Sequence, residues 1–207
     1  MLPAVYLNIV CGVGALDGWS PLAGLAQGHK KSGSIMSHVL RCLAVLAAMV
    51  VLAAVDTAQR PAEAQATVAF RGYPVGTIVV RTNQRRLYLV VGQDRAISYP
   101  VGVGKAGQQW SGTAYINGKY IKPAWSPPAD IKRANPRLPN VIAGGSPRNP
   151  MGAAALTLSG GEYAIHGTNA PGSVGGFVSY GCIRMHNSDI MDLFGRVSYG
   201  TPVIVTR

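Results

Sequence analysis

Residues 165–187 bring together the side chains of this sequence that are best suited to chemistry. Beyond residue 66, this stretch contains the one cysteine, Cys182, and both histidines, His166 and His186. A thiol with an ordinary pKa of about 8.5 is only a few per cent ionised at neutral pH, so a nucleophilic cysteine needs a base or a positive charge close by. The stretch therefore indicates an acyl-transfer site built from cysteine and histidine.

The candidate base is His166, which ends a short predicted strand. The glycine-rich chain after it allows the backbone to fold back and bring Cys182 beside the ring. We expect His166 to take the thiol proton and return it to a leaving amine, with the backbone carbonyl of Gly167 orienting the imidazole. His186 is the competing base, but a helix begins just after it, so we expect a structural role for it. The sulfur and the His166 ring should meet at the floor of an open groove.

Groups that could stabilise a transition state lie next to the cysteine. The backbone N–H groups of Tyr180, Gly181 and Cys182 are the candidate oxyanion hole, and a glycine at 181 allows a reacting carbonyl to come close. Arg184 supplies a fixed positive charge, either for a substrate carboxylate or for the local fold.

Two other roles for these residues are less well supported. A buried inert cysteine usually sits in an apolar element, whereas Tyr180-Gly181-Cys182 is a glycine-containing turn. One cysteine and two histidines without regular spacing do not provide the ligands of a tetrahedral metal site. We therefore expect no metal and no cofactor.

Residues 36–66 look like a secretory signal peptide. A short basic start is followed by an apolar run from Cys42 to Val55 and then by two candidate cleavage sites, Ala62-Glu63-Ala64 and Ala64-Gln65-Ala66. The alternative is a membrane anchor, but the run is shorter than the ~20 apolar residues that span a bilayer. We therefore expect an exported mature chain, 67–207, located in the periplasm or cell envelope.

Residues 1–35 precede this signal and show no periodic pattern. We interpret them as an unstructured upstream extension that arises because the reading frame was started before Met36. Cleavage near residue 66 would remove Cys11 and Cys42, so we expect no disulfide within the mature chain.

The charge of the chain restricts its partners. It has 19 Lys and Arg against 8 Asp and Glu, a formal net charge of +11, and such a surface attracts polyanions. Export removes the protein from nucleic acid, so an anionic envelope polymer such as peptidoglycan is the expected partner. Contact with the membrane is expected only transiently, through the signal peptide.

The pattern of the mature chain favours many short strands and one helix, hence a mainly β fold of the sandwich or barrel type. Glycine (26) and proline (14) are frequent, as in chains rich in turns. The proline-rich segment 103–150 is expected to be a long irregular loop that forms a lid or groove wall. A helix capped by Asn187 or Ser188 should run to Phe194, with Gly195 near its end. The predicted strands are 76–82, 87–91, 96–102, 154–158, 162–166 and 203–206.

At these residues the chain resembles the L,D-transpeptidase, or YkuD domain, family, over roughly residues 75–207. The motifs that carry the resemblance are Ile165-His166-Gly167-Thr168, Ser179-x-Gly181-Cys182-Ile183-Arg184-Met185 with Asn187, Pro123-x-Trp125-x-Pro127-Pro128, Asn149-Pro150-Met151-Gly152 and Gly200-Thr201-Pro202-Val203. The resemblance implies a β-sandwich catalytic domain in which Ser179, Arg184 and Asn187 contribute to substrate binding.

The resemblance also implies a reaction. Cys182 would attack the L-centre carbonyl of a diaminopimelyl–D-Ala bond in a peptidoglycan stem tetrapeptide, and D-Ala would leave. An amine would then take the acyl group from the thioester. That amine would belong to a second stem, giving a crosslink between diaminopimelate residues, or to an envelope protein.

The sequence departs from the family pattern at two places. Tyr180 stands where a histidine usually precedes Gly-Cys, but His166 matches the family histidine that pairs with the cysteine, so we expect activity to survive. Trp110-Ser111-Gly112-Thr113 stands where relatives tend to carry a Thr-Pro-x-Gly turn, and it should reshape one wall of the groove.

Two other functions remain compatible with these residues. The same site could pass the acyl group to water, as an L,D-carboxypeptidase or cysteine peptidase. The domain could also be a non-catalytic peptidoglycan-binding module in which Tyr180 marks an inactive site.

Overall fold

The computed structural model describes residues 6–8, 65–161 and 163–207. Most of the predicted signal peptide and most of the stretch 1–35 lie outside these residues, whereas the last two residues of the signal peptide, Gln65 and Ala66, are described and Ala66 begins strand β2, Ala66–Ala69. Three residues of the stretch 1–35, Tyr6–Asn8, form strand β1. The prediction that this stretch is unstructured is therefore wrong for these three residues. Strand β1 pairs in parallel with β8, Ala124–Ser126. Within the described ranges, no helix is both long enough and apolar enough to cross a membrane.

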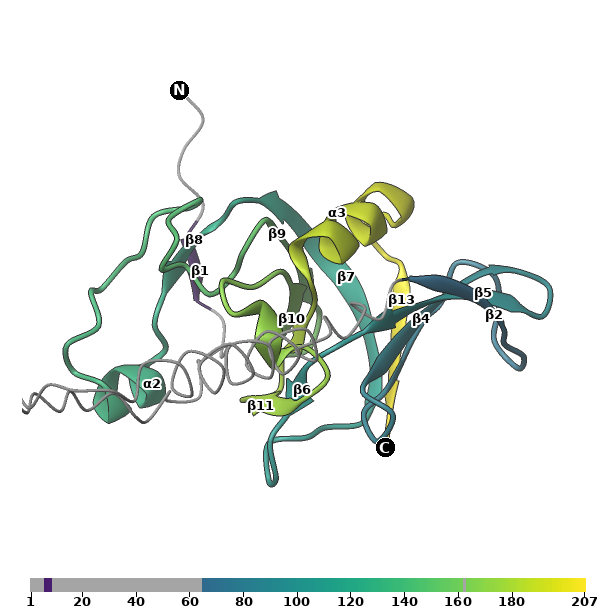
Figure 1. Ribbon diagram of the computed structural model, residues 1–207, viewed down its shortest axis with the longest axis horizontal. Coiled ribbons are helices and arrows are strands. Elements are labelled where there is room, and N and C mark those ends of the chain that lie inside the picture. Colours follow the sequence, from purple (N-terminus) through teal and green to yellow (C-terminus); the bar gives the residue numbers. More distant parts are fainter. Residues whose placement is uncertain (1–5, 9–64, 162) are drawn as a thin grey trace, which may run out of the picture. The chain divides into compact units, whose positions relative to one another are not determined.

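Strands dominate the fold (Figure 1), which confirms the predicted mainly β class. Nine of them form one sheet in the order β12-β10-β9-β7-β13-β3-β4-β5-β2. Their bounds are β2 Ala66–Ala69, β3 Ile78–Arg81, β4 Arg86–Gly92, β5 Arg95–Pro100, β7 Gly112–Ile121, β9 Ala154–Leu158, β10 Ala164–His166, β12 Ile183–Arg184 and β13 Pro202–Thr206. A second small pair joins β6, Val103–Gly104, to β11, Phe177–Ser179.

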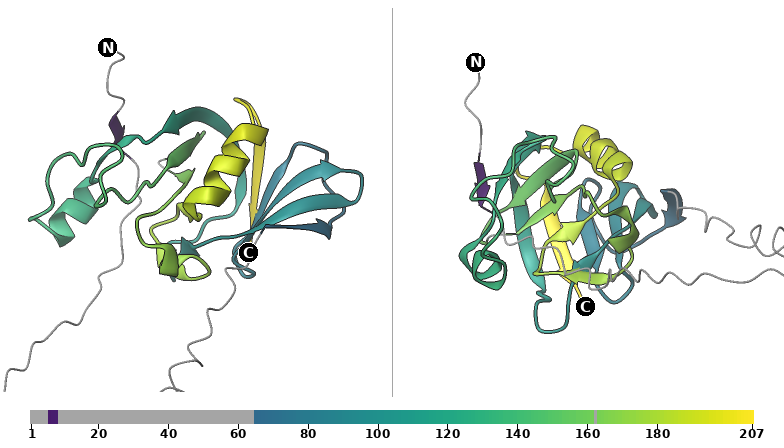
Figure 2. Two further views of the ribbon diagram at one scale, coloured as in Figure 1. Left: turned by 45° about the horizontal axis from the view of Figure 1, so that its top comes forward. Right: turned by 60° about the vertical axis from the view of Figure 1, so that its left-hand side comes forward.

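Strand β7 connects the two halves of this sheet. Its residues Gly112–Tyr115 pair with β13, and its residues Ile116–Ile121 pair with β9, with an irregularity in register after Ile116. Figure 2 shows β7 bending as it passes from one half to the other. Apolar side chains from both halves share one core. They include Ile78, Val80, Leu87 and Leu89 on one side and Leu156, Leu158, Ile165 and Ile183 on the other.

The prediction of an irregular segment over 103–150 is wrong in part. This segment contains β7, the longest of the described strands, as well as β6, β8 and helix α2, Ala129–Ala134. The inward positions of β7 are Ala114, Ile116 and Gly118, which alternate with exposed or half-buried residues. Two of these three side chains are too small to produce a clear apolar period in the sequence.

The predicted C-terminal helix is present as α3, Asn187–Arg196, but its ends differ from the prediction. His186 occupies the N-cap position and makes no capping hydrogen bond through its side chain, so neither Asn187 nor Ser188 is the cap. The helix continues through Gly195 to Arg196. Ile190 and Leu193 are buried as predicted, and they belong to the same core as the sheet.

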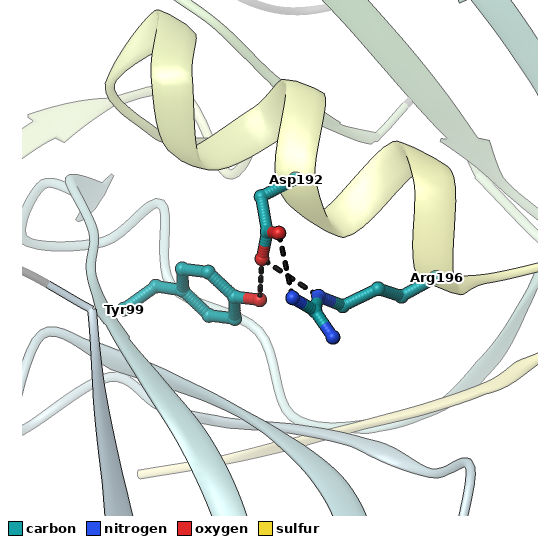
Figure 3. A network of polar contacts seen from close by, with 3 residues as sticks. All are labelled: Tyr99, Asp192 and Arg196. Carbon is teal, nitrogen blue, oxygen red and sulfur yellow. Dashed lines mark hydrogen bonds and ion pairs between the residues drawn. The ribbon is translucent and has the colours of Figure 1, made fainter.

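A polar network ties α3 to β5 (Figure 3). The hydroxyl of Tyr99, a buried residue of β5, donates a hydrogen bond of 2.6 Å to Asp192 Oδ2. Arg196 donates to both carboxylate oxygens of Asp192 at 2.8 Å. Because a charged acceptor strengthens each of these bonds, the network should fix the helix on the sheet.

We expect Asp192→Asn to lower the free energy of unfolding by about 1–3 kcal/mol at pH 7, because a buried tyrosine then loses its charged acceptor. The hydrogen bond from Arg196 lowers the pKa of Asp192 in the folded state. The contribution of the carboxylate is therefore present above its unfolded pKa of about 3.9 and is lost as the pH falls below that value. Urea unfolding should show that the free energies of unfolding of the wild type and of Asp192→Asn differ less at pH 3 than at pH 7.

Asp94→Asn is the matched control, because Asp94 pairs with Arg71 at 3.2 Å where both side chains are largely exposed. Exposed pairs contribute about 0–1 kcal/mol. An equal loss of stability in the two variants would contradict a special role for the network around Asp192.

Candidate active site

His166 lies at the end of β10 and is completely buried. Its Nδ1 is 2.6 Å from the carbonyl oxygen of Gly167. A carbonyl can only accept, so Nδ1 carries the proton in the neutral ring and Nε2 carries the lone pair. Among the described residues, Nε2 is buried and has no hydrogen-bond partner. The ring is thus held by its own neighbour in the tautomer that a general base needs.

The surroundings of His166 keep it neutral. The pKa of His166 is lowered to about 3. Burial is the main cause, and the positive charge of Arg184 acts in the same direction. The carbonyl groups of Gly167 and Pro150 act against this shift but do not cancel it. At neutral pH the buried ring is therefore neutral.

The register of the sheet brings Cys182 to the same face as His166. Strands β10 and β12 are parallel, with Ile165 opposite Ile183 and His166 opposite Arg184. Cys182 directly precedes β12, and alternation along a strand puts it on the His166 side. With strands about 4.8 Å apart and a rise of about 3.3 Å per residue, extending β12 by one residue puts the two Cα atoms roughly 8 Å apart.

The environment of Cys182 differs from the predicted open groove. The residue is completely buried in a second apolar cluster, and the prediction of a sulfur exposed at a groove floor is wrong for this structure. Cys182 is also disulfide-bonded. The two other cysteines of the sequence, Cys11 and Cys42, lie outside the described residues. The cluster around Cys182 contains Trp125, Ile131, Ile142, Met151, Ala155 and Ala164.

Ser179 braces the turn that carries the cysteine. Its hydroxyl is buried, accepts a hydrogen bond from the Gly181 N–H at 3.1 Å and donates one to the Cys182 carbonyl at 2.6 Å. The structure thus gives Ser179 contacts within the turn, and it engages one of the three amides predicted for the oxyanion hole. Tyr180 is half-buried, and the Lys105 ammonium lies 3.8 Å from the centre of its ring.

Arg184 is buried beside His166 rather than exposed to a substrate. It is 1% exposed, and its guanidinium donates to Ser173 Oγ at 2.9 Å. Of the two roles predicted for Arg184, these contacts favour support of the local fold, together with the electrostatic effect on His166.

Asn187 holds the segment that follows His166. Its Oδ1 accepts hydrogen bonds from the N–H groups of Ala153 and Thr168, both at 3.0 Å. Its Nδ2 donates to the Thr168 carbonyl at 3.0 Å. All of these partners are backbone groups, so Asn187 supports the loop that follows His166.

A cleft of about 460 Å³ opens beside this loop. Thr168, Asn187 and Lys122 contribute to its wall. Among the described residues that line the cleft, Lys122 is the one with a positively charged side chain. Its other lining residues come from the turns around residues 145–153 and 169–171. Sequence reasoning did not identify this cleft, because its walls are far apart along the chain.

We expect Asn187→Ala to destabilise the protein by about 2–4 kcal/mol, since three hydrogen bonds are lost and backbone groups of the His166 loop lose their partner. Thermal and urea unfolding would measure the effect. Asn169→Ala is the matched control in the same loop, because its amide makes one exposed bond of 3.2 Å to the Pro147 carbonyl. A loss no larger than that of the control would show that Asn187 does not hold the loop.

Comparisons with known proteins show which family this chain is similar to. Residues 76–205, more than half of the chain, match the family model described as YkuD, L,D-transpeptidase catalytic domain. Two relatives from Escherichia coli (strain K12) carry the names "Probable L,D-transpeptidase YbiS" and "Probable L,D-transpeptidase ErfK/SrfK". They are 40% and 38% identical over 135 residues, which is 61% of this chain and 43% and 42% of theirs. The chain thus spans less than half the length of these curated relatives.

Solved structures show the same fold. An L,D-transpeptidase from Mycobacterium smegmatis superposes with a TM-score of 0.50 at 20% identity, over 63% of this chain and 58% of that one. The Ldtfm–avibactam carbamoyl enzyme superposes with a TM-score of 0.52 at 19% identity, over 65% and 50% of the two chains. At these identities the likeness concerns the fold alone.

Proposed function

The chain belongs to the L,D-transpeptidase (YkuD) family, and from this premise we propose that it is an exported cysteine transpeptidase of peptidoglycan. The observation that carries the proposal is the state of His166. Its Nδ1 is fixed by the Gly167 carbonyl and its Nε2 keeps a lone pair in a buried position on the Cys182 face of the sheet.

In the first step, His166 Nε2 takes the proton of the Cys182 thiol as the sulfur attacks a carbonyl carbon. The carbonyl electrons move to oxygen, and backbone N–H groups of the 180–182 turn stabilise that oxyanion. The tetrahedral species collapses with cleavage of the C–N bond. His166 returns its proton to the nitrogen, so D-Ala leaves as an amine and the acyl group remains on sulfur as a thioester.

In the second step, an amine attacks the thioester. His166 accepts a proton from the attacking nitrogen and gives it to the departing sulfur, which restores the thiol. The products are a new amide and the original enzyme. The acceptor is the side-chain amine of diaminopimelate on a second stem or an amine of an envelope protein.

The proposed chemistry needs two changes at Cys182. The disulfide must be absent, and the apolar cover from residues 125–151 must move aside. Cleavage of a signal peptide at residues 36–66, together with loss of residues 1–35, would satisfy the first requirement, because Cys11 and Cys42 would leave with it. Residues 67–207 would then form the catalytic domain with its sulfur as a thiol.

Charge supports a wall polymer as the partner. The net charge of +11 favours an anionic polymer, and an exported protein would meet peptidoglycan carboxylates in the periplasm or cell envelope rather than nucleic acid.

The test is mass spectrometry of the reduced, purified protein incubated with tetrapeptide muropeptides. We expect a covalent adduct on Cys182 that retains the acyl group without D-Ala, followed by dimers linked between diaminopimelate residues. Tripeptides without dimers would indicate transfer to water and a carboxypeptidase. Binding without an adduct would indicate a non-catalytic wall-binding module.

A further inference from the structure

The indole of Trp110 holds the backbone directly before Cys182. Its Nε1–H donates a hydrogen bond of 2.9 Å to the carbonyl oxygen of Gly181. Trp110 belongs to the loop that leads into β7 and lies 71 residues away from Gly181 along the chain. The bond therefore joins two segments that only the folded domain brings together.

Tyr163 keeps the indole in position. The two rings are stacked, with centroids 5.1 Å apart and planes inclined by 6°. Gly181 has φ +122°, and a Cβ at this position would lie 2.3 Å from Tyr163 Cε1. The tyrosine ring therefore packs directly against the Gly181 backbone while its face supports Trp110. Together, the two aromatic residues restrict the orientation of the Gly181 carbonyl.

The orientation of that carbonyl determines where the Cys182 amide points. In a trans peptide unit the C=O and the following N–H point in opposite directions, and no described peptide bond is cis. A bond from Trp110 to the Gly181 oxygen therefore turns the Cys182 N–H away from the indole. Of the three amides in the candidate oxyanion hole, this is the one whose direction Trp110 sets.

We infer that Trp110 is a positioning residue for acyl transfer, acting through the Gly181–Cys182 peptide on the amide that stabilises the oxyanion. The inference rests on the proposed function, because it concerns a tetrahedral intermediate formed on Cys182. It assigns a role to the Trp110-Ser111-Gly112-Thr113 segment, at which the sequence is expected to depart from the family pattern.

The test compares two reactions of the same sulfur in Trp110→Phe, using reduced protein. Phenylalanine keeps a ring to stack on Tyr163 but removes the N–H donor. Release of D-Ala from a tetrapeptide muropeptide passes through an oxyanion, whereas alkylation of Cys182 by iodoacetamide does not. We expect kcat for D-Ala release to fall by about tenfold or more with little change in KM, while the alkylation rate stays within about twofold.

Tyr115→Phe is the matched control, because it also removes one polar group from an aromatic ring, on the part of β7 that pairs with β13. Its kcat should be unchanged, and thermal unfolding should verify that both variants are folded. An unchanged kcat in Trp110→Phe, or an equal fall in kcat and in alkylation, would overturn the inference. Wild-type protein that is alkylated but releases no D-Ala would instead overturn the proposed function, and with it the inference.

Discussion

Cys182→Ala should abolish the release of D-Ala from tetrapeptide muropeptides, with a fall in rate of about 10⁴-fold or more. The reason is that no other described side chain can form the thioester, and loss of a nucleophile in an acyl-transfer site removes the covalent route completely. Any remaining release of D-Ala would come only from substrate binding and from the dipoles of backbone groups in the site. Mass spectrometry of the intact protein measures the second consequence, which is the disappearance of the acyl adduct.

The control for this variant separates loss of chemistry from loss of structure. Cys182 is completely buried, so relative to the reduced wild-type protein its truncation leaves a small cavity that should cost about 1 kcal/mol of stability. Cys182→Ser fills more of that space and should be as inactive while being nearly as stable as the wild type. A variant that remains folded and releases D-Ala at the wild-type rate would remove Cys182 from the mechanism.

His166→Gln should lower the rate of D-Ala release by about 10²–10⁴-fold, the usual contribution of general acid–base catalysis. Glutamine can still hydrogen bond, but it cannot carry the thiol proton to the leaving amine. His186→Gln is the matched control, since His186 is half-buried at the start of α3 and its side chain makes no capping bond. Equal losses in the two variants would contradict the assignment of His166 as the base.

The free energy of unfolding should also depend on pH because of His166. Its pKa in the folded state is lowered to about 3 by burial, against about 6.5 in an unfolded chain. The unfolded state therefore binds more protons between these values, so stability should fall as the pH drops from about 6.5 toward 3. In urea unfolding, His166→Gln should show a weaker dependence on pH over this window. An identical dependence in wild type and variant would mean that the buried ring titrates normally.

Much of the fold could be predicted because its signals are local. Strands β3, β4 and β5 carry apolar β-formers between turn residues, and β13 is a plain run of the same kind. Helix α3 was predictable from its apolar period, although its start was misplaced. Strand β7 was missed because its inward residues are small, and α2 because it is short and follows two prolines.

The sequence by itself determined which groups can do chemistry. It placed one cysteine and one strand-ending histidine in a shared motif, with a carbonyl next to the histidine that can fix its tautomer. These features depend on residue identity and on neighbours one or a few positions away. The motif alone is therefore sufficient to indicate the family.

Only the tertiary structure decided how those groups are placed and covered. The bonds from Asn187 to Ala153 and from Trp110 to Gly181 join residues 34 and 71 positions apart. The burial of Cys182 depends on side chains from the distant segment 125–151. Packing of this kind arises from contacts between segments that are remote in sequence, so residue types in one stretch could not reveal it.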